Sequence, residues 1–419
     1  MKRNVKRMRI RLYESLIELL LIIGVGIPLI FGFVLDTWRT ILTIAIVLVW
    51  LLYIVTHKPR KSASSRFLNF YLCGFTGIVI CEIIKAATIY NYSDYEIFYA
   101  LRQYSWLLLS IPLYYEMIKK NGLDRYLNII ANITVTSLII RAFTWFCKNY
   151  LGFTVFYNLL YEYGNSWGRD GKQRLDATAL IGVIIPILYY MFRKYRKRKY
   201  LGMLVFVFLY LIFVSQTRTL LLGAMACMIA MILFERRSST KKLIIQLSFL
   251  AVIIIAINMG AVDFLIDKMN LSVNDGSIGY RQYEFAYFSS LIFPDKWKTG
   301  LGIITTLNTA GRRLVYGNLD TQMYLDDLGV FECFLQFGLF SLFLYGTLMS
   351  YIGYVIVKCN REKAYTYTLY LTGQFFYIAL VSLPLNLFGI QRIFSVPIIL
   401  AITCTIHNHL IEMEMGNNL

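Results

Sequence analysis

The chain has 419 residues, of which 58% are hydrophobic and only 16% are charged, and its mean hydropathy is +0.58. Soluble globular domains carry about a quarter charged residues, so this composition excludes a water-soluble fold, a disordered chain and a fibrous repeat. The formal net charge is +18, but its distribution, given below, requires no nucleic-acid partner. The seven cysteines include no C-x-x-C pair, so we expect neither a disulfide framework nor a metal site.

Apolar runs of about 17–25 residues predict membrane-spanning helices, because a helix of that length crosses a hydrocarbon core about 30 Å thick. Such runs recur along the whole chain, and we expect an all-α polytopic membrane protein, with residues 1–419 forming a single membrane domain. The twelve predicted spans are 16–35, 38–56, 67–90, 98–118, 126–146, 175–192, 200–216, 218–234, 243–260, 328–357, 365–383 and 391–409.

Lys and Arg gather in the amino-terminal tail and in alternate connections between the predicted spans. Because cytoplasmic loops are enriched in Lys and Arg, these connections and both termini are expected on the cytoplasmic side, facing anionic lipid. The basic tail and first apolar run resemble a signal peptide, but they lack a small-x-small cleavage site, so we expect a retained first helix. The basic connections are 58–66, 119–125, 193–199, 236–242 and 358–363.

Two long connections, residues 147–174 and 261–327, fall on the opposite, outer side. The cytoplasmic loops are all short and carry no Walker A sequence. ATP-driven transport by this chain alone is therefore disfavoured, and any chemistry is expected to face outward.

Several charged residues lie within predicted spans, where an ionisable group is costly and often functional. Glu82 and Lys85 stand one helical turn apart, a spacing that favours a self-neutralising pair. Arg102, Arg141 and Arg392 fall in the outer half of the membrane. Each alone is compatible with a structural arginine that reaches the interface. Together they indicate an anion such as a lipid diphosphate, because a guanidinium donates two hydrogen bonds to one phosphate.

The run Ser215-Gln216-Thr217-Arg218-Thr219 separates two apolar runs at the outer face. Small hydroxyl residues around Arg218, where the chain reverses direction, predict a compact anion-binding turn, although a structural role for this arginine stays open.

The outer loop 261–327 contains a Gly-containing turn followed by Arg281. The aromatic-rich run 283–293 then predicts a helix that either lies at the membrane interface or packs within the loop. Pro294 and its neighbours end this helix, and Gly300-Leu301-Gly302 forms a G-x-G turn. No strand or third glycine follows, so a dinucleotide fold is not expected.

Three carboxylates, Asp320, Asp326 and Asp327, cluster before the tenth predicted span. Their spacing disfavours a metal site of the DxD glycosyltransferase type. One of them could act as a general base toward a sugar hydroxyl. The alternative is helix capping, because acidic side chains are favourable in the first turn of a helix.

The order of these features resembles the O-antigen ligase and Wzy-type polysaccharide polymerase superfamily of bacterial envelope enzymes. The family's S-x-[ST]-R-[GT] turn matches 215–219 and places its first arginine at Arg218. Its second arginine, between a Gly-containing turn and an aromatic-rich helix, matches Arg281, and its G-x-G matches 300–302. Its last signature, counted back from Gly338-Leu339-Phe340-Ser341, falls on Asp327.

Ligases of this family carry His followed by Asn at the last position, whereas this chain has Asp327 followed by Leu328. His407 and His409 lie near the cytoplasmic carboxyl terminus and cannot serve. The difference favours a polymerase and leaves Asp326, Asp320 and Glu284 as alternative bases.

The resemblance implies a GT-C-like architecture and glycosyl transfer between undecaprenyl-diphosphate-linked oligosaccharides at the outer face of the bacterial cytoplasmic membrane. Arg218 and Arg281 would stabilise the leaving diphosphate, and Asp327 would remove the proton from the attacking hydroxyl. No metal or other cofactor is expected. The partners are the lipid-linked donor and acceptor and the bilayer, with a chain-length regulator or a flippase as further candidates. Substrate-binding roles are expected for Arg141, Arg102, Arg392, Asp320, Asp326 and Glu284.

Two other classes of function stay open from the sequence. One is ligase-type transfer of a glycan to another acceptor, which the Asp327 difference disfavours. The other is a transporter or flippase of lipid-linked oligosaccharide, which suits twelve spans equally well. The chain shows no internal repeat of the kind that many transporters carry.

Overall fold

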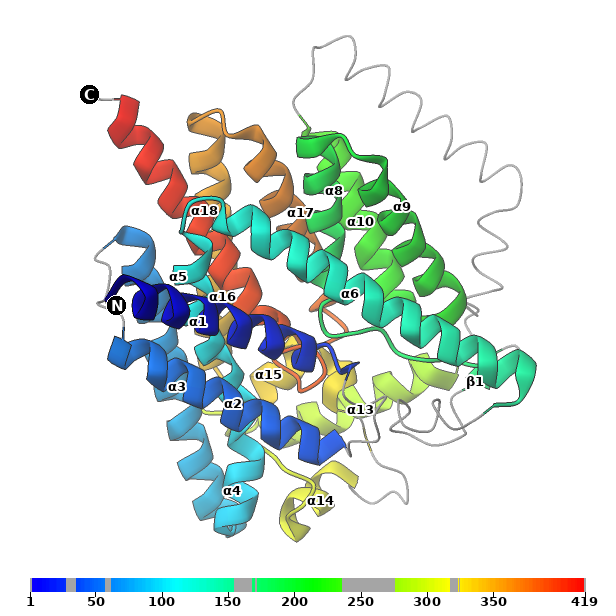
Figure 1. The fold of residues 1–419 in the computed structure, drawn as a ribbon. Helices are drawn as coiled ribbons and strands as arrows, with labels where there is room; N and C mark the ends of the chain where they lie inside the picture. The colour runs from blue at the N-terminus through cyan, green and yellow to red at the C-terminus, as the bar shows by residue number, and fades with distance from the viewer. Residues whose placement is uncertain are drawn as a thin grey trace.

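A computed structural model describes residues 2–27, 35–56, 62–153, 168–169, 172–235, 276–316, 323 and 325–417 of the chain. The regular secondary structure of this part is helical, apart from the two-residue strands β1 (Gly168–Arg169) and β2 (Lys172–Gln173), which pair antiparallel. The all-α class predicted from the sequence is therefore confirmed (Figure 1). The helices of the first half are α1 (Lys2–Gly24), α2 (Leu35–Thr56), α3 (Ala63–Tyr90), α4 (Asp94–Leu101), the 3-10 helix η2 (Tyr104–Leu109), α5 (Ser110–Met117), α6 (Gly122–Phe146) and the π-helix η3 (Cys147–Leu151).

The second half continues the same helical pattern. Its helices are α8 (Ile181–Tyr195), α9 (Arg198–Leu209), the π-helix η4 (Tyr210–Ser215), α10 (Arg218–Phe234), α13 (Gly276–Ile292), α14 (Thr309–Tyr316), the 3-10 helix η5 (Leu325–Leu328), α15 (Val330–Phe337), α16 (Phe340–Arg361), α17 (Tyr365–Val381) and α18 (Ser395–Asn417).

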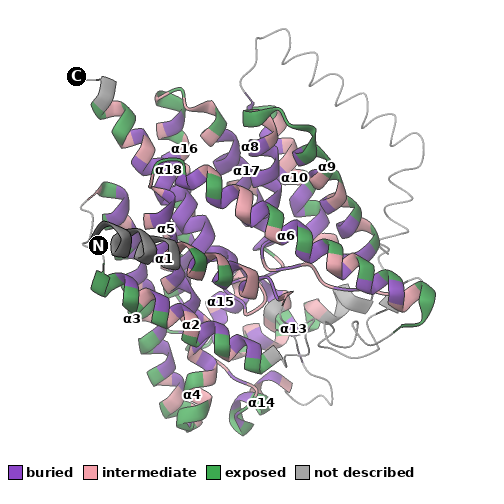
Figure 2. Cartoon of the chain, in the orientation of Figure 1, coloured by how far each residue is buried: buried purple, intermediate pink, exposed green. Residues whose placement is uncertain are grey.

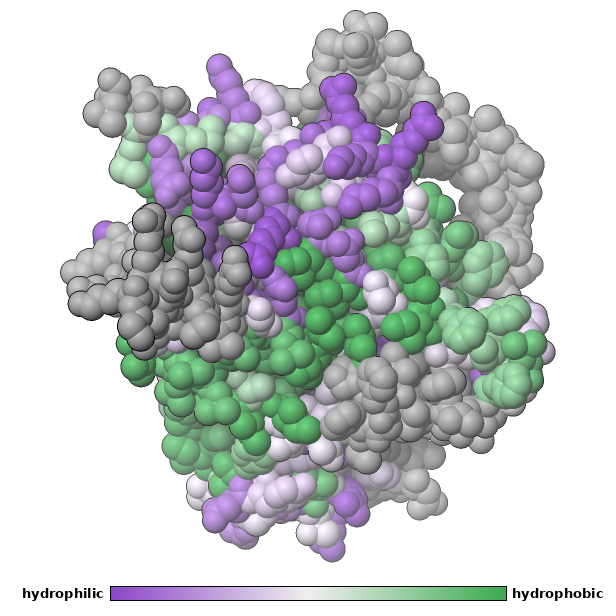
Figure 3. All heavy atoms as spheres, viewed as in Figure 1, coloured by the Kyte–Doolittle hydropathy of each residue, from purple (hydrophilic) through white to green (hydrophobic). Residues whose placement is uncertain are grey.

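Six described helical segments are long and apolar enough to cross a bilayer, and α10 is a shorter apolar helix. Figure 3 shows a hydrophobic band between two hydrophilic ends of the molecule. Large apolar side chains such as Leu48 on α2 and Val205 on α9 are exposed within the described part. The predicted span 243–260 lies outside the described residues. The six segments are 36–56, 63–90, 122–151, 198–215, 340–361 and 395–415.

Two predicted spans are interrupted in the structure. Residues 98–118 divide into the end of α4, η2 and α5. Pro112 in the first turn of α5 has no N–H to donate to the carbonyl four residues earlier, which disfavours a continuous α-helix from η2 into α5. Residues 328–357 divide at Gly338, which has a φ of +56° and separates α15 from α16. Both runs are apolar along their whole length, so their hydropathy does not reveal either break.

Other predicted boundaries also shift. Only residues 16–24 of the first predicted span, 16–35, belong to α1, which starts at Lys2 and ends at Gly24, and residues 28–34 lie outside the described part. The sixth, 175–192, becomes helical only at Ile181, so residues 174–180 are non-helical. The last, 391–409, begins as α18 at Ser395.

Close helix packing among α8, α10 and α17 depends on glycines. A Cβ on Gly182 of α8 would lie 2.2 Å from the Tyr377 ring, and one on Gly223 of α10 would lie 2.2 Å from Val381 Cγ2. Small residues allow helix backbones to approach in this way. Figure 2 shows α17 and α18 largely buried inside the molecule. The amino ends of α8 and α10 therefore meet the carboxyl half of α17.

The basic connections gather at one end of the molecule. Lys194 in the last turn of α8 binds Asp124 at the start of α6 at 2.6 Å, and Lys358 near the end of α16 binds Glu414 of α18 at 2.9 Å. Tyr190 stacks on Tyr367, so the start of α17 also lies at this end. The connections 119–125, 193–199 and 358–363 thus share one end (Figure 1). Which side of a membrane this end faces stays a prediction.

At the other end, the G-x-G turn joins the outer loop to the break between α15 and α16. Gly300 and Gly302 have φ values of +70° and +85°. The Leu301 N–H donates to the Leu335 carbonyl at 2.7 Å, and the Gly302 N–H donates to the Gln336 carbonyl at 3.0 Å. A Cβ on Gly300 would lie 2.5 Å from the Gln336 carbonyl oxygen. The glycines of this motif therefore allow a close backbone contact that fixes the loop.

Candidate active site

Arg281 and Asp327, both expected to be catalytic, form an ion pair. Arg281 Nη2 lies 3.2 Å from Asp327 Oδ2, and the two side chains are 39% and 37% exposed. Arg281 lies on α13, which confirms the predicted helix over 283–293 and extends it back to Gly276. Asp327 lies in η5. A small apolar cluster that includes Phe288 and Leu328 packs these two elements together.

A second carboxylate, Asp176, lies in the non-helical segment before α8 and is surrounded by guanidinium groups. Arg141 Nη1 of α6 donates to the Asp176 main-chain oxygen at 3.2 Å, and the Tyr210 hydroxyl donates to the same oxygen at 2.9 Å. Burial raises the pKa of the Asp176 carboxyl above its ordinary value. Three neighbouring positive charges lower this pKa in part, and the nearby Asp327 charge raises it; the positive charges are those of Arg174, Arg392 and Arg141.

Arg218 is the first residue of α10, directly after the predicted turn. The π-helix η4 ends where Gln216 adopts a left-handed φ of +52°. The hydroxyls of Ser215 and Thr217 then hydrogen-bond to each other at 2.8 Å. Arg218 thus stands at the amino terminus of a 17-residue helix, where the helix dipole already favours an anion.

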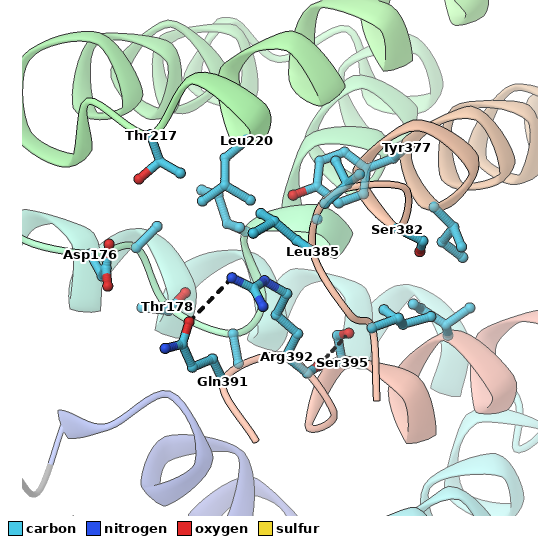
Figure 4. A pocket seen from close by; sticks show the side chains of 18 of the residues that line it. Asp176, Thr178, Thr217, Leu220, Tyr377, Ser382, Leu385, Gln391, Arg392 and Ser395 are labelled. Atoms are coloured by element: carbon cyan, nitrogen blue, oxygen red, sulfur yellow. Dashed lines mark hydrogen bonds between the residues drawn. The ribbon is translucent and has the colours of Figure 1, made fainter. Parts of the chain in front are cut away.

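A cavity of about 630 Å³, measured with the part open to solvent, lies between these elements (Figure 4). Asp176 and Thr178 line one wall, and Thr217, the neighbour of Arg218, lines another. Gln374 of α17 and Arg392 of the 382–394 connection add further polar groups to the lining. The other lining residues are Ala177, Ala179, Ile181, Gly182, Leu220, Tyr377, Ile378, Val381, Ser382, Leu385, Leu387, Gln391, Ser395 and Ile399.

Several polar atoms of the cavity wall have no hydrogen-bond partner within the described residues. They are Thr178 Oγ1, both side-chain amide atoms of Gln374, and Arg392 Nη1. Gln374 is 0% exposed and Thr178 is 3% exposed. A buried polar atom without a partner costs about 1–3 kcal/mol, so these atoms are suited to a ligand that supplies hydrogen bonds.

A buried polar network holds the connection that carries Arg392. Asn386 Nδ2 donates to Glu332 Oε2 at 2.7 Å, and Gln336 Nε2 donates to Glu332 Oε1 at 2.8 Å. The Tyr345 hydroxyl donates to Asn386 Oδ1 at 2.9 Å and accepts from the Leu387 N–H at 2.8 Å. The cavity wall at 382–392 is therefore fixed from behind by α15 and α16.

The remaining predicted residues lie elsewhere or outside the described part. Arg102 Nη2 binds Asp36 Oδ1 at 2.6 Å and stands 3.8 Å from the Tyr99 ring, so its described contacts are those of a structural arginine. Glu284 is buried on α13, one turn after Arg281. Asp320 lies outside the described residues, and so does the side chain of Asp326.

Glu82 and Lys85, predicted to lie within a membrane span, form the expected i,i+3 ion pair on α3. Lys85 also donates to the Thr299 carbonyl and, at 3.3 Å, to the Gly300 carbonyl. The pair therefore has a structural role in addition to neutralising itself, since it holds the G-x-G turn against α3.

Four residues of the site were not predicted from the sequence: Asp176, Arg174, Thr178 and Gln374. Gln374 could have been found from the sequence, because it is a lone amide in an apolar run. The first three residues carried a weaker signal: Arg174 and Asp176 bracket the start of a predicted span, and their meaning depends on that segment being non-helical.

No protein-family model matches this chain, and no curated protein matches it. The fold and site define an all-α protein with membrane-length helices and a cavity whose wall carries Arg392, with the charges of Arg141 and Arg174 acting on Asp176 in the same wall. The resemblance carried by the short motifs stays a prediction.

Proposed function

We propose that this protein is a polysaccharide polymerase that transfers a growing glycan from undecaprenyl diphosphate to another lipid-linked repeat unit on the outer face of the bacterial cytoplasmic membrane. The observation that carries the proposal is the gathering of arginines around one cavity. Arg141, Arg174 and Arg392 surround Asp176, and Arg218 follows a lining residue. These positive charges outnumber the negative charges of the nearby carboxylates, Asp176 and Asp327, which suits an anionic substrate.

The chemistry follows from the charge that develops during the reaction. Breaking the sugar–phosphate bond leaves negative charge on the lipid diphosphate. Guanidinium groups that bind this charge more tightly in the transition state than in the ground state accelerate the reaction. Arg218 and Arg281 would do this, and the Asp327 carboxylate would orient the Arg281 guanidinium through their ion pair. A carboxylate beside the cavity would take the proton from the attacking hydroxyl.

The carrier lipid would lie along the apolar surface beside Arg281. Tyr283 and Phe285 on α13 are about half exposed, and the Phe285 ring lies 4.4 Å from that of Phe331, measured between centroids. Aromatic rings at such a surface are suited to the boundary between lipid headgroups and acyl chains.

The first test compares single-arginine variants in cells that lack the native protein. Arg218→Ala and Arg281→Ala should leave the protein in the membrane but stop chain extension, so a ladder gel should show single repeat units only. Arg→Lys variants should also fail where two hydrogen bonds to one phosphate are needed. Arg313→Ala, an exposed arginine on α14 of the same outer loop, is the matched control and should retain the full ladder. Long polymer from both test variants would refute the mechanism.

Transport is the second candidate function. Its support is that helices are interrupted at Gly338 and at Gln216, and discontinuous helices are typical of transporter sites. A transporter would move lipid-linked oligosaccharide without lengthening it. Ligase-type transfer would instead leave polymer of normal length that is not attached to its acceptor.

A further inference from the structure

Asp176 differs from Asp327 in what its carboxylate contacts. Asp327 binds Arg281 at 3.2 Å. The hydrogen bonds at Asp176 from Arg141 and Tyr210 reach its main-chain oxygen, and within the described residues no donor reaches its carboxylate oxygens. The main chain is therefore held in place while the carboxylate stays available at the cavity wall (Figure 4).

The deeper wall of the same cavity has the chemistry of a sugar-binding site. A sugar hydroxyl both donates and accepts, as does the amide of Gln374, and the Thr178 hydroxyl does the same. These buried groups have no partner within the described residues. Tyr377 adds an aromatic ring to the lining.

The geometry points to this cavity as the site for the acceptor's terminal sugar, with Asp176 as the catalytic residue that accepts the proton of the attacking hydroxyl. This inference rests on the proposed function and assigns to Asp176 the base role that the sequence predicted for Asp327. Asp327 then becomes the residue that positions Arg281.

The step balances without another reactant. The hydroxyl oxygen of the acceptor forms a bond to the anomeric carbon of the donor, and its proton moves to the Asp176 carboxylate. The bond between that carbon and the phosphate oxygen breaks, and its electron pair leaves with the lipid diphosphate. Asp176 then loses the proton to water.

The electrostatics of Asp176 suit this role. Burial raises the pKa of Asp176 toward neutral pH, which makes its carboxylate a stronger base than that of an ordinary Asp. The positive charges that oppose this shift come from its own segment, from α6 and from the 382–394 connection, and they stabilise the carboxylate form. They are Arg174, Arg141 and Arg392.

The experiment measures extension by the purified full-length protein. The substrate is the lipid-linked single repeat unit extracted from cells that lack the protein. Asp176→Asn removes the proton acceptor without breaking a hydrogen bond in the described part, so it should fold normally and lower kcat by about 10²–10⁴-fold. Asp295→Asn, an exposed carboxylate after α13, is the matched control and should retain wild-type kcat.

The pH profile separates the two carboxylates. The wild-type rate should rise with pH along an acid limb set by the raised pKa of Asp176. Asp327→Asn should lower the rate and keep this limb, shifted toward lower pH because the Asp327 charge no longer raises the pKa of Asp176. Gln374→Ala should raise KM for the acceptor by about tenfold, as expected for lost hydrogen bonds, and leave the limb unchanged.

The outcomes distinguish this inference from the proposed function. Wild-type extension together with wild-type kcat in Asp176→Asn would overturn the inference alone, and so would an acid limb that disappears in Asp327→Asn. A wild-type protein that extends no lipid-linked unit would overturn the proposed function and the inference with it.

Discussion

Replacing Asn386 with Ala should destabilise the protein through the network behind the cavity. Asn386 is 3% exposed and makes three hydrogen bonds with its side chain. Its amide donates to Glu332 at 2.7 Å, and its oxygen accepts from the Tyr345 hydroxyl at 2.9 Å and from the Phe388 N–H at 3.0 Å. The substitution removes these partners without offering a replacement.

The magnitude follows from which groups lose their partners. Glu332 is 4% exposed, and a buried carboxylate that loses a donor costs about 2–3 kcal/mol. It keeps its second donor, Gln336, at 2.8 Å. The lost bonds from Tyr345 and Phe388 cost about 1 kcal/mol each. The expected loss of stability is therefore about 4 kcal/mol.

Thermal unfolding of the purified protein in one detergent tests this value. Asn386→Ala should lower the midpoint clearly, while Asn360→Ala should leave it nearly unchanged. Asn360 is exposed near the end of α16, and its side chain makes no hydrogen bond within the described residues. Because the network fixes the connection that carries Arg392, activity should fall in Asn386→Ala as well. Equal midpoints for the two variants would refute the assignment of the network as a structural support.

Three further predictions concern stability and pH. Gly300 has a φ of +70°, and main-chain atoms lie 2.5 and 2.6 Å from a Cβ added there. Gly300→Ala should therefore lower the free energy of unfolding by about 2–4 kcal/mol. In Gly346→Ala the new Cβ meets no atom within 4 Å, so this control should not lower the unfolding midpoint. Arg281→Ala and Asp327→Ala should each change the free energy of unfolding by less than about 1 kcal/mol, because both side chains are more than a third exposed. Each variant should nevertheless abolish extension. A large shift of the unfolding midpoint would show that the pair is structural instead. The backbone N–H of the N-cap serine of α4 holds the pKa of Glu96 below its ordinary value. This cap should therefore stabilise the fold at pH values above the ordinary pKa of Glu and lose that contribution as the pH falls through the lowered pKa of Glu96. Glu96→Gln should remove this part of the pH dependence in unfolding scans from pH 7 to pH 3.

The sequence allowed the all-α class and many helix positions to be predicted, because long apolar runs leave few alternatives. The pairing of Glu82 with Lys85 followed from their spacing alone. The break at Gly338 did not, because it depends on a main-chain contact with the distant Gly300. Local patterns carry no information about such contacts.

The candidate site was predicted only in part for the same reason. Arg281 and Asp327 were both selected from motifs, and the structure adds that they form an ion pair. Asp176 was absorbed into a predicted span, since its segment reads as the start of an apolar run. Arg102 was grouped with the site because it falls in the outer half of a predicted span, whereas the structure pairs it with Asp36 on α2.

The most direct test of the proposed function uses the purified protein alone in lipid vesicles. It would be supplied with lipid-linked single repeat units, and both glycan length and released lipid diphosphate would be measured. The proposal predicts longer glycans, with one undecaprenyl diphosphate released for each glycosidic bond formed. Movement of the lipid-linked unit across the bilayer, with no lengthening and no released lipid diphosphate, would contradict it.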